Sequence, residues 1–281
     1  MKIDLDRLDE DELVVEHFAK VKAKKGRLKG KQNVHQLLAQ DADPDDPEAK
    51  FESEDLNGLV RDGYLDDLLS VIKTGKEASV YLGRGPGGLV AIKIYTDLRV
   101  RSFKRDTAYR QGRFIGDARV EKAIWQSSRF GHEARQELWV QEEFRQMLYL
   151  REYGVRVPGA VAVRGRSLIM EFIGSAQGKP APRISDLKLE EDEALEAFRQ
   201  SVRNLKLIVR AGRVHGDYST YNLLWQDGEA VVIDFPQVME FKQNREAPAF
   251  LERDVRSLCR SFAKQGIQAD EAHLLREVRA S

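Results

Sequence analysis

A long amphipathic segment, followed at once by two short apolar runs, constrains the fold more than any other feature of the chain. Acidic residues open the segment 191–210 and Gly212 follows it, which is typical of the start and end of an α-helix. Within it, apolar residues recur at spacings of three and four: Leu195, Phe198, Val202, Leu205 and Ile208. The spacing predicts a helix whose apolar face lines a core.

Polar residues at fixed spacing surround the two apolar runs that come next. The runs 223–225 and 231–233 flank an Asp-Gly turn, which predicts a hairpin. Asp217 and Asn222 precede the first strand, and Asp234 ends the second. Phosphoryl transfer needs this order, because Asp217 can accept the proton of an attacking hydroxyl while Asn222 and Asp234 hold Mg²⁺ against nucleotide phosphates. Any one of these residues commonly caps a turn or ends a strand, but the full set in this order is not explained that way.

The N-terminal half offers an amine and a loop that such a site requires. A β-prone run ends at Leu82 and a second covers 89–95, with a Gly-Pro-Gly-Gly turn between them, so we expect an antiparallel pair of strands. Lys93 has apolar neighbours on the second strand, where its amine can bind nucleotide phosphates. The loop 74–79 lacks a repeated glycine pattern, but its backbone N–H groups and Lys76 can still reach phosphate oxygens.

A helix is predicted from about 133 to 152, and it carries a partner for the lysine. Glu143 could pair with Lys93 and hold it in place, and the neighbouring Glu142 stays open as an alternative. Taken alone, a strand lysine and a helical glutamate are usually surface residues. Their position ahead of Asp217 favours the functional interpretation.

The remaining segments complete the expected organisation. Apolar residues between Leu56 and Leu69 predict one or two short helices, interrupted near a glycine. The runs 160–163 and 167–173 predict two strands, and the Gly- and Pro-containing connector after them a hinge between two lobes. Residues 97–131 are strongly basic and predict an inserted, mobile loop.

The first fifty-odd residues consist of three charge blocks. Residues 1–16 are acidic, 20–31 are basic, and 41–55 are acidic again. This composition predicts a solvated, partly flexible arm over 1–54. The basic block could contact RNA phosphates, although the two acidic blocks can compensate it within the chain.

Composition excludes several classes of protein. The 46 Lys and Arg residues equal the 46 Asp and Glu residues, so a general polyanion binder is not expected. Cys259 is the single cysteine, which rules out an internal disulfide or a cysteine metal cluster, and the acidic N-terminus does not resemble a secretory signal. No run approaches the ~20 apolar residues that span a bilayer. We therefore expect a cytoplasmic protein without membrane contact.

These residues resemble the RIO family of atypical serine/threonine protein kinases, in its bacterial and archaeal form. The resemblance runs from about Leu56 to Lys264, and its most specific parts are residues 74–81, 91–93, 170–174, 215–222 and 233–237. It implies an α+β, protein-kinase-like fold of two small lobes over 55–281. The N-lobe, about 55–173, would hold an antiparallel sheet plus a helix, with 97–131 as the family's flexible insertion. The C-lobe, about 174–281, would be reduced and helical, without an activation segment or a peptide-docking subdomain.

The resemblance also implies roles for individual residues. Met170, Glu171 and Phe172 would form the adenine-facing hinge. Asp254 would brace the catalytic loop from the last helices, and His215 is also expected to brace it. The other implied roles agree with the chemistry above: Lys76 and Lys93 on phosphates, Glu143 as the partner of Lys93, Asp217 as catalytic base, Asn222 and Asp234 on the metal. The chain departs from the family pattern at Lys73, where serine is usual.

The activity implied by the resemblance is that of a non-specific serine/threonine protein kinase using ATP with Mg²⁺, or Mn²⁺ in its place. Autophosphorylation, slow ATPase activity, an aspartyl-phosphate on Asp234 and a role in small ribosomal subunit maturation accompany this activity in the family. The substrate would be an unidentified protein or the chain itself. Contact with a ribosomal subunit or RNA would use the basic segments 20–31 and 99–122.

Two alternatives stay open. Small-molecule kinases of the aminoglycoside and choline kinase type share a His-Gly-Asp, Asn and Ile-Asp set, so residues 215–234 alone do not separate the two classes. The loop 75–77, the basic insertion and the lack of a large C-terminal helical domain favour the RIO interpretation. The second alternative is an ATP-gated binding module of a ribosome-assembly partner, in which chemistry is secondary.

Overall fold

The computed structural model describes residues 50–96 and 129–281. Residues 1–49 of the predicted arm and 97–128 of the predicted insertion lie outside this part of the chain. The end of the predicted arm is folded, since Phe51 is buried and its backbone N–H and C=O both bond to the Asn57 side chain. Residues 50–54, assigned to the arm because of their charge, therefore belong to the folded part.

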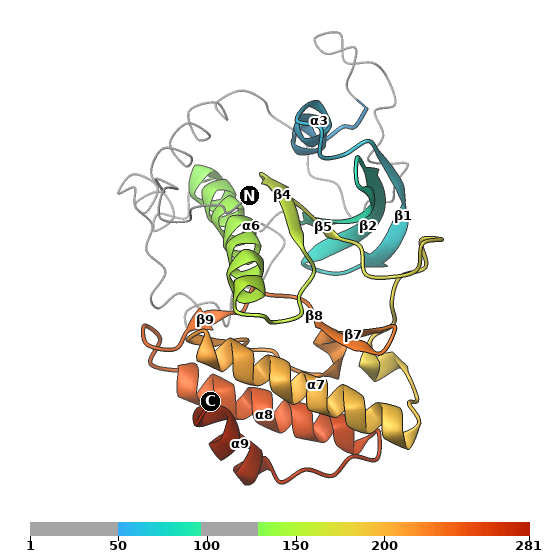
Figure 1. Cartoon of the computed structure of the whole chain (residues 1–281). Coiled ribbons are helices and arrows are strands. Elements are labelled where there is room, and N and C mark those ends of the chain that lie inside the picture. The colour runs from blue at the N-terminus through green and yellow to red at the C-terminus, as the bar shows by residue number, and fades with distance from the viewer. Residues whose placement is uncertain (1–49, 97–128) are drawn as a thin grey trace.

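A five-stranded antiparallel sheet forms the N-terminal lobe together with two helices (Figure 1). The strand order is β1-β2-β3-β5-β4. The elements are α3 (Glu54–Arg61), β1 (Asp67–Thr74), β2 (Ala78–Gly85), β3 (Gly88–Tyr95), α6 (Arg129–Glu152), β4 (Ala160–Arg164) and β5 (Ser167–Glu171). The predicted antiparallel pairing of the strands on either side of the Gly-Pro-Gly-Gly turn is confirmed as β2 and β3.

The prediction of helix up to Leu69 was partly wrong. A helix does form at α3, but Leu68 and Leu69 lie in β1, which pairs with β2 along its whole length. Only Leu68 of this pair is buried, while Leu69 is exposed. Pairing with a neighbouring strand thus outweighed the local apolar spacing, as is common for short segments.

The two faces of the sheet bury different sets of side chains. Val90, Ile92 and Ile169 pack against α3 in one cluster. Tyr95 and Leu168 point to the opposite face, where they join a larger cluster with α6. Because side chains alternate along a strand, each residue of β3 and β5 has its face fixed by its neighbours.

The C-terminal lobe contains three helices and two short hairpin-like pairs, and Figure 1 shows α7, α8 and α9 stacked below the sheet. Its elements are η3 (Ile184–Asp186), α7 (Glu191–Arg210), β6 (Arg213–Val214), η4 (Thr220–Asn222), β7 (Leu223–Gln226), β8 (Glu229–Val232), β9 (Met239–Glu240), α8 (Ala247–Ala263) and α9 (Glu271–Arg279). The predicted helix 191–210 and the predicted hairpin are both confirmed.

One buried cluster crosses from lobe to lobe. It joins Val140 and Met147 of α6 to Leu205 of α7 and Phe262 of α8. Cys259 of α8 is buried in the same cluster, as its place on an apolar helix face suggested. In the described ranges, no helix has the length and apolar character needed to cross a membrane.

The buried face of α7 can be tested by one pair of substitutions. Leu205→Ala should lower the free energy of unfolding by about 2–5 kcal/mol, because Leu205 is fully buried. Leu207→Ala, the same change on the same helix, should cost less because Leu207 is only partly buried. Urea denaturation measures both values, and equal losses would contradict the helix orientation described here.

Candidate active site

A largely buried lysine, its side chain 12% exposed, joins the two lobes at the centre of the site. Lys93 lies on the face of β3 that points toward α6, two residues before Tyr95. Its Nζ donates to Glu143 Oε1 at 2.7 Å and to Asp234 Oδ1 at 2.8 Å. Burial would lower the pKa of Lys93, but the Asp234 and Glu143 carboxylates outweigh it and raise that pKa well above its usual value. The ammonium group is therefore charged at any physiological pH.

Glu143, and not Glu142, is the partner of this lysine. Glu143 is buried on α6, while Glu142 is half-exposed and accepts from Gln146 Nε2 at 2.7 Å. The second oxygen of Glu143 accepts a short hydrogen bond from the Tyr95 hydroxyl. The alternative left open by the sequence is resolved by the helix face, since only one of two adjacent residues can point at the sheet.

Tyr95 is a site residue that the sequence analysis missed. Its hydroxyl is buried, and burial followed by the Glu143 charge raises its pKa well above the usual value. The backbone N–H of Phe235 also donates to Glu143 Oε1, at 3.3 Å. Strand alternation from Lys93 could have placed Tyr95 on this face, but nothing in the sequence pairs it with the glutamate.

Asp217 and Asn222 lie side by side, as their spacing predicted. Asn222 Nδ2 donates to the Asp217 carbonyl at 2.8 Å and to Asp217 Oδ2 at 3.0 Å. Partial removal from water raises the pKa of Asp217, an effect that the Asn222 bond opposes and the Asp234 charge reinforces. By contrast, the Lys93 charge lowers the pKa of Asp234. The two carboxyl groups of the site therefore differ in basicity, with Asp217 the stronger base.

A buried carboxylate from α8 holds the loop that carries Asp217. Asp254 accepts from Gly216 N at 2.8 Å and from Tyr218 N at 3.0 Å, and it is 1% exposed. The Arg253 guanidinium donates a short bond to the Gly216 carbonyl. These bonds fix the backbone on both sides of Asp217.

His215 supports the same loop from the protein interior. It is fully buried, and its Nδ1 accepts from the Asp217 backbone N–H at 3.3 Å. Its ring lies edge-on to Tyr218 and Phe235, with centroids 5.4 and 5.7 Å away. Burial lowers the pKa of His215 to about 4, so the ring is neutral and its contacts are those of a packing residue.

Two residues of the site adopt backbone conformations that most side chains avoid. Gly216 has φ of 81°, and a Cβ there would lie 2.8 Å from the Gln237 carbonyl oxygen. Asp234 has φ of 71° although it is not glycine. Glycine adopts this conformation without strain, whereas for Asp234 it costs on the order of 1–3 kcal/mol, and such residues gather at functional sites.

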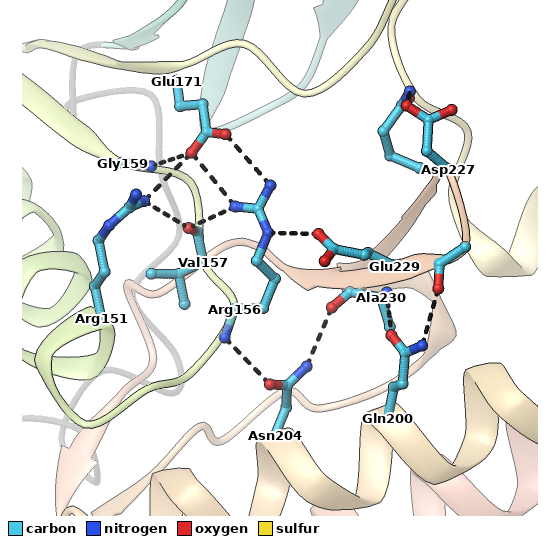
Figure 2. A network of polar contacts seen from close by, with 12 residues as sticks. Arg151, Arg156, Val157, Gly159, Glu171, Gln200, Asn204, Asp227, Glu229 and Ala230 are labelled. Atoms are coloured by element: carbon cyan, nitrogen blue, oxygen red, sulfur yellow. Dashed lines mark hydrogen bonds and ion pairs between the residues drawn. The ribbon is translucent and has the colours of Figure 1, made fainter.

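Of the three hinge side chains, that of Glu171 is held by contacts within the protein. Met170 and Phe172 are half-buried. The Glu171 carboxylate instead accepts from Gly159 N at 2.8 Å and pairs with Arg151 and Arg156 at 3.3 Å each (Figure 2). Any contact of Glu171 with a nucleotide would therefore be made by its backbone.

Arg156 extends this network into the C-terminal lobe. Its Nε donates to Glu229 at 3.1 Å, and its backbone N–H donates to Asn204 Oδ1 at 3.2 Å (Figure 2). A polar pocket of about 360 Å³ lies beside these residues, lined also by Gln200. The short segment before β4 is thus bonded to both lobes.

The loop 74–79 joins β1 to β2 and is closed by a bond from Gly75 N to the Ala78 carbonyl at 3.0 Å. Lys76 is exposed on it. Burial is the largest cause of the raised pKa of Asp217, and the charge of Glu77 adds to it. The loop therefore lies within electrostatic reach of that carboxylate.

Comparison of the sequence with known proteins identifies the family of this chain. The model of a family described as "RIO domain" matches residues 79–274. The RIO-type serine/threonine-protein kinase Rio1 of Haloferax volcanii is 38% identical over 217 residues, which are 75% of this chain and 69% of the relative. Rio1 of Methanocaldococcus jannaschii is 30% identical over 226 residues, 79% of this chain and 72% of the relative. The chain therefore belongs to the RIO family, and it is a serine/threonine protein kinase of the RIO type.

The fold agrees with this assignment. The Rio2 kinase–ADP/Mg²⁺–phosphoaspartate complex from Chaetomium thermophilum superposes with a TM-score of 0.58 at 18% identity, over 81% of this chain and 66% of that one. The predicted α+β, two-lobed kinase-like fold is confirmed. The eukaryotic relative Serine/threonine-protein kinase RIO1 of Caenorhabditis elegans is 30% identical over 78% of this chain, but this match spans 42% of the relative.

Asp254 and His215 should give opposite pH dependence to stability. Burial raises the pKa of Asp254 from 3.8 to about 7 and lowers that of His215 from 6.5 to about 4. At pH values between 3.8 and about 7, Asp254 is protonated more often in the folded chain than in the unfolded chain. At pH values between about 4 and 6.5, His215 is protonated less often in the folded chain. The contribution of Asp254 to stability is therefore lost as pH rises toward 7, whereas that of His215 is lost as pH falls toward 4.

We expect the variant Asp254→Asn to expose the contribution of His215. Its free energy of unfolding should rise with pH from 4 to 6.5, by on the order of 3 kcal/mol more than in the wild type. The variant should also be less stable at neutral pH, because an amide offers one acceptor to two backbone N–H donors. Urea denaturation across this pH range measures both effects, and parallel curves for the two proteins would contradict the assignment.

Proposed function

We propose that the site transfers the γ-phosphoryl group of ATP to a serine or threonine hydroxyl, with Asp217 as the catalytic base. The observation that carries this proposal is the Lys93 ammonium held between Glu143 of α6 and Asp234 of the C-terminal lobe. Lys93 is thereby bound to Asp234, whose charge acts on Asp217, and this suits the binding of phosphates between the lobes. The pair with Glu143 is largely buried, whereas Asp234 is about half exposed, so the glutamate is the more firmly held of the two partners.

The residues present fit a hard divalent cation. Asn222 donates through its amide nitrogen to Asp217, which leaves its Oδ1 as a ligand, and Asp234 has a second oxygen besides the one bound to Lys93. Oxygen ligands of this kind suit Mg²⁺, with Mn²⁺ as a substitute, and nucleotide phosphates supply the others. The cation would neutralise charge on the transferred group.

Asp217 is placed to accept a proton. Asn222 holds one carboxylate oxygen, and the other remains for the attacking hydroxyl. The raised pKa of Asp217 improves its strength as a base, while the lowered pKa of Asp234 keeps that group an anion. Met170, Phe172 and the Glu171 backbone would bind the base of the nucleotide, and Lys76 and its loop would cover the phosphates.

The organisation and partners that we propose follow the same assignment. The kinase domain covers 55–281, extended at its start by the packed residues 50–54, with the lobes meeting near 173 and 174. The Rio2 structure is described as a phosphoaspartate complex, and this supports an aspartyl-phosphate on Asp234 here, with slow ATPase activity, besides autophosphorylation. Contact with a ribosomal subunit would use the basic segments 20–31 and 99–122. Cosedimentation before and after neutralising these segments tests that contact.

Labelled ATP with Mg²⁺ tests the central proposal. The wild type should release phosphate or label itself, and Asp217→Asn and Asp234→Ala should each lower the rate at least ~100-fold, because each removes a group that acts in the transfer. A label on Asp234 should be removed by hydroxylamine, whereas one on serine or threonine should survive. A folded wild type that binds ATP without turnover would instead favour the ATP-gated binding module.

Adjacent glutamates provide a matched pair for the role of α6. Glu143→Gln should raise the KM for ATP by about tenfold, because Lys93 would lose one of its two anionic partners. Glu142→Gln changes the same group one residue earlier and should leave KM unchanged, since Glu142 pairs with Gln146 and Arg145. Steady-state ATPase or autophosphorylation rates at several ATP concentrations separate them. Equal effects would contradict the pairing.

A further inference from the structure

The connector between β5 and α7 contains a short segment that is paired like an extra strand. Trp225 N donates to the Pro182 carbonyl at 2.9 Å, and Arg183 forms an antiparallel bridge with Leu224 of β7. Further back, Gly174 bridges Pro180. The backbone at Arg183 is thus fixed against the strand that directly follows Asn222.

This pairing determines the side to which Arg183 points. In β7, Leu223 is fully buried in the main core, so Leu224 faces the opposite side. There it packs with Ile173 of the hinge and Val231 of β8. Directly paired residues share a face, so Arg183 lies on the hinge side of the hairpin with Leu224.

The next residue confirms this orientation. Ile184, one position further along, is fully buried in the main core. Arg183 is the extended residue before η3, with φ of −74° and ψ of 149°, so its side chain and that of Ile184 point to opposite sides. The Arg183 side chain is therefore directed away from the core and toward the region between hinge and hairpin.

Arg183 stands near the site and has no fixed anionic partner there. It is half-buried, and among the side chains that the structure describes, those of 50–96 and 137–281, none forms a hydrogen bond or ion pair with it. After Lys93 and His215, its charge is among those that lower the pKa of Asp234. A partly desolvated guanidinium without a partner is costly unless a ligand supplies one.

We propose that Arg183 binds the polyphosphate of the nucleotide, as a second cation facing Lys93 across Asp234. This inference rests on the proposed function, because it assigns a specificity-determining residue to the same site. A guanidinium can donate two parallel hydrogen bonds to phosphate oxygens, which the Lys93 ammonium cannot. Arg183 comes from the connector and Lys93 from the sheet, so the phosphates would be bound from both lobes. Nucleosides carry no phosphates, so their affinity does not depend on this contact.

The test compares the affinity of ATP, ADP and adenosine for the full chain in the presence of Mg²⁺, by titration calorimetry. Arg183→Ala should weaken ATP and ADP by on the order of tenfold and leave adenosine unchanged. Arg183→Lys should recover part of the loss, because it keeps the charge but not the paired donors. Arg199→Ala is the control, since Arg199 lies exposed on α7 and pairs only loosely with Glu196, at 3.9 Å.

The outcomes distinguish this inference from the proposed function. Unchanged affinities for ATP and ADP in Arg183→Ala would overturn the role of Arg183 while the wild type still binds nucleotide. Equal weakening of adenosine would also overturn it, because that result indicates a structural role for the connector. A folded wild type that binds neither ATP nor ADP would remove the proposed function, and the role of Arg183 with it.

Discussion

The ammonium group of Lys93, shared between Glu143 and Asp234, is the interaction on which the rest of the site depends. Each of its two partners comes from a different element, α6 and the end of the hairpin, and the lysine comes from a third. Burial lowers the pKa of Lys93, and the charges of the two carboxylates outweigh this effect and keep the group an ammonium. One ammonium group therefore links the helix, the sheet and the hairpin.

The loop around Asp217 is held by bonds to its backbone rather than by an ion pair. Its polar backbone groups are satisfied by Asp254, a carboxylate whose own burial is unfavourable enough to raise its pKa to about 7. His215 next to it is held neutral. Asp254 holds the backbone N–H of Gly216, while the left-handed Asp234 is bound by Lys93. The surrounding structure thus offsets the cost of a loop that could not hold its shape alone.

The sequence predicted the parts of the fold that depend on strong local patterns. The helix 191–210 and the order of Asp217, Asn222 and Asp234 were readable because periodicity and spacing specify them. The strand β1 was not, since its pairing with β2 outweighs its apolar spacing. The choice between Glu142 and Glu143 needed the rotation of α6, and Arg183 needed the bridge to Leu224. Contacts between segments that are far apart in the sequence produce no pattern of residue spacing, so the sequence alone does not predict them.

The bonds of Arg156 have a consequence for the chain as a whole. Its backbone carbonyl accepts from Val232 N at 2.8 Å, its N–H donates to Asn204, and its side chain connects Glu171 with Glu229 (Figure 2). A segment that belongs to the N-terminal lobe in sequence is therefore anchored in the C-terminal lobe. If the chain were cut at the hinge and the lobes separated, backbone donors and acceptors of both pieces would lose their hydrogen-bond partners. The lobes are separate in shape, but because of these bonds we expect them to unfold as one cooperative unit.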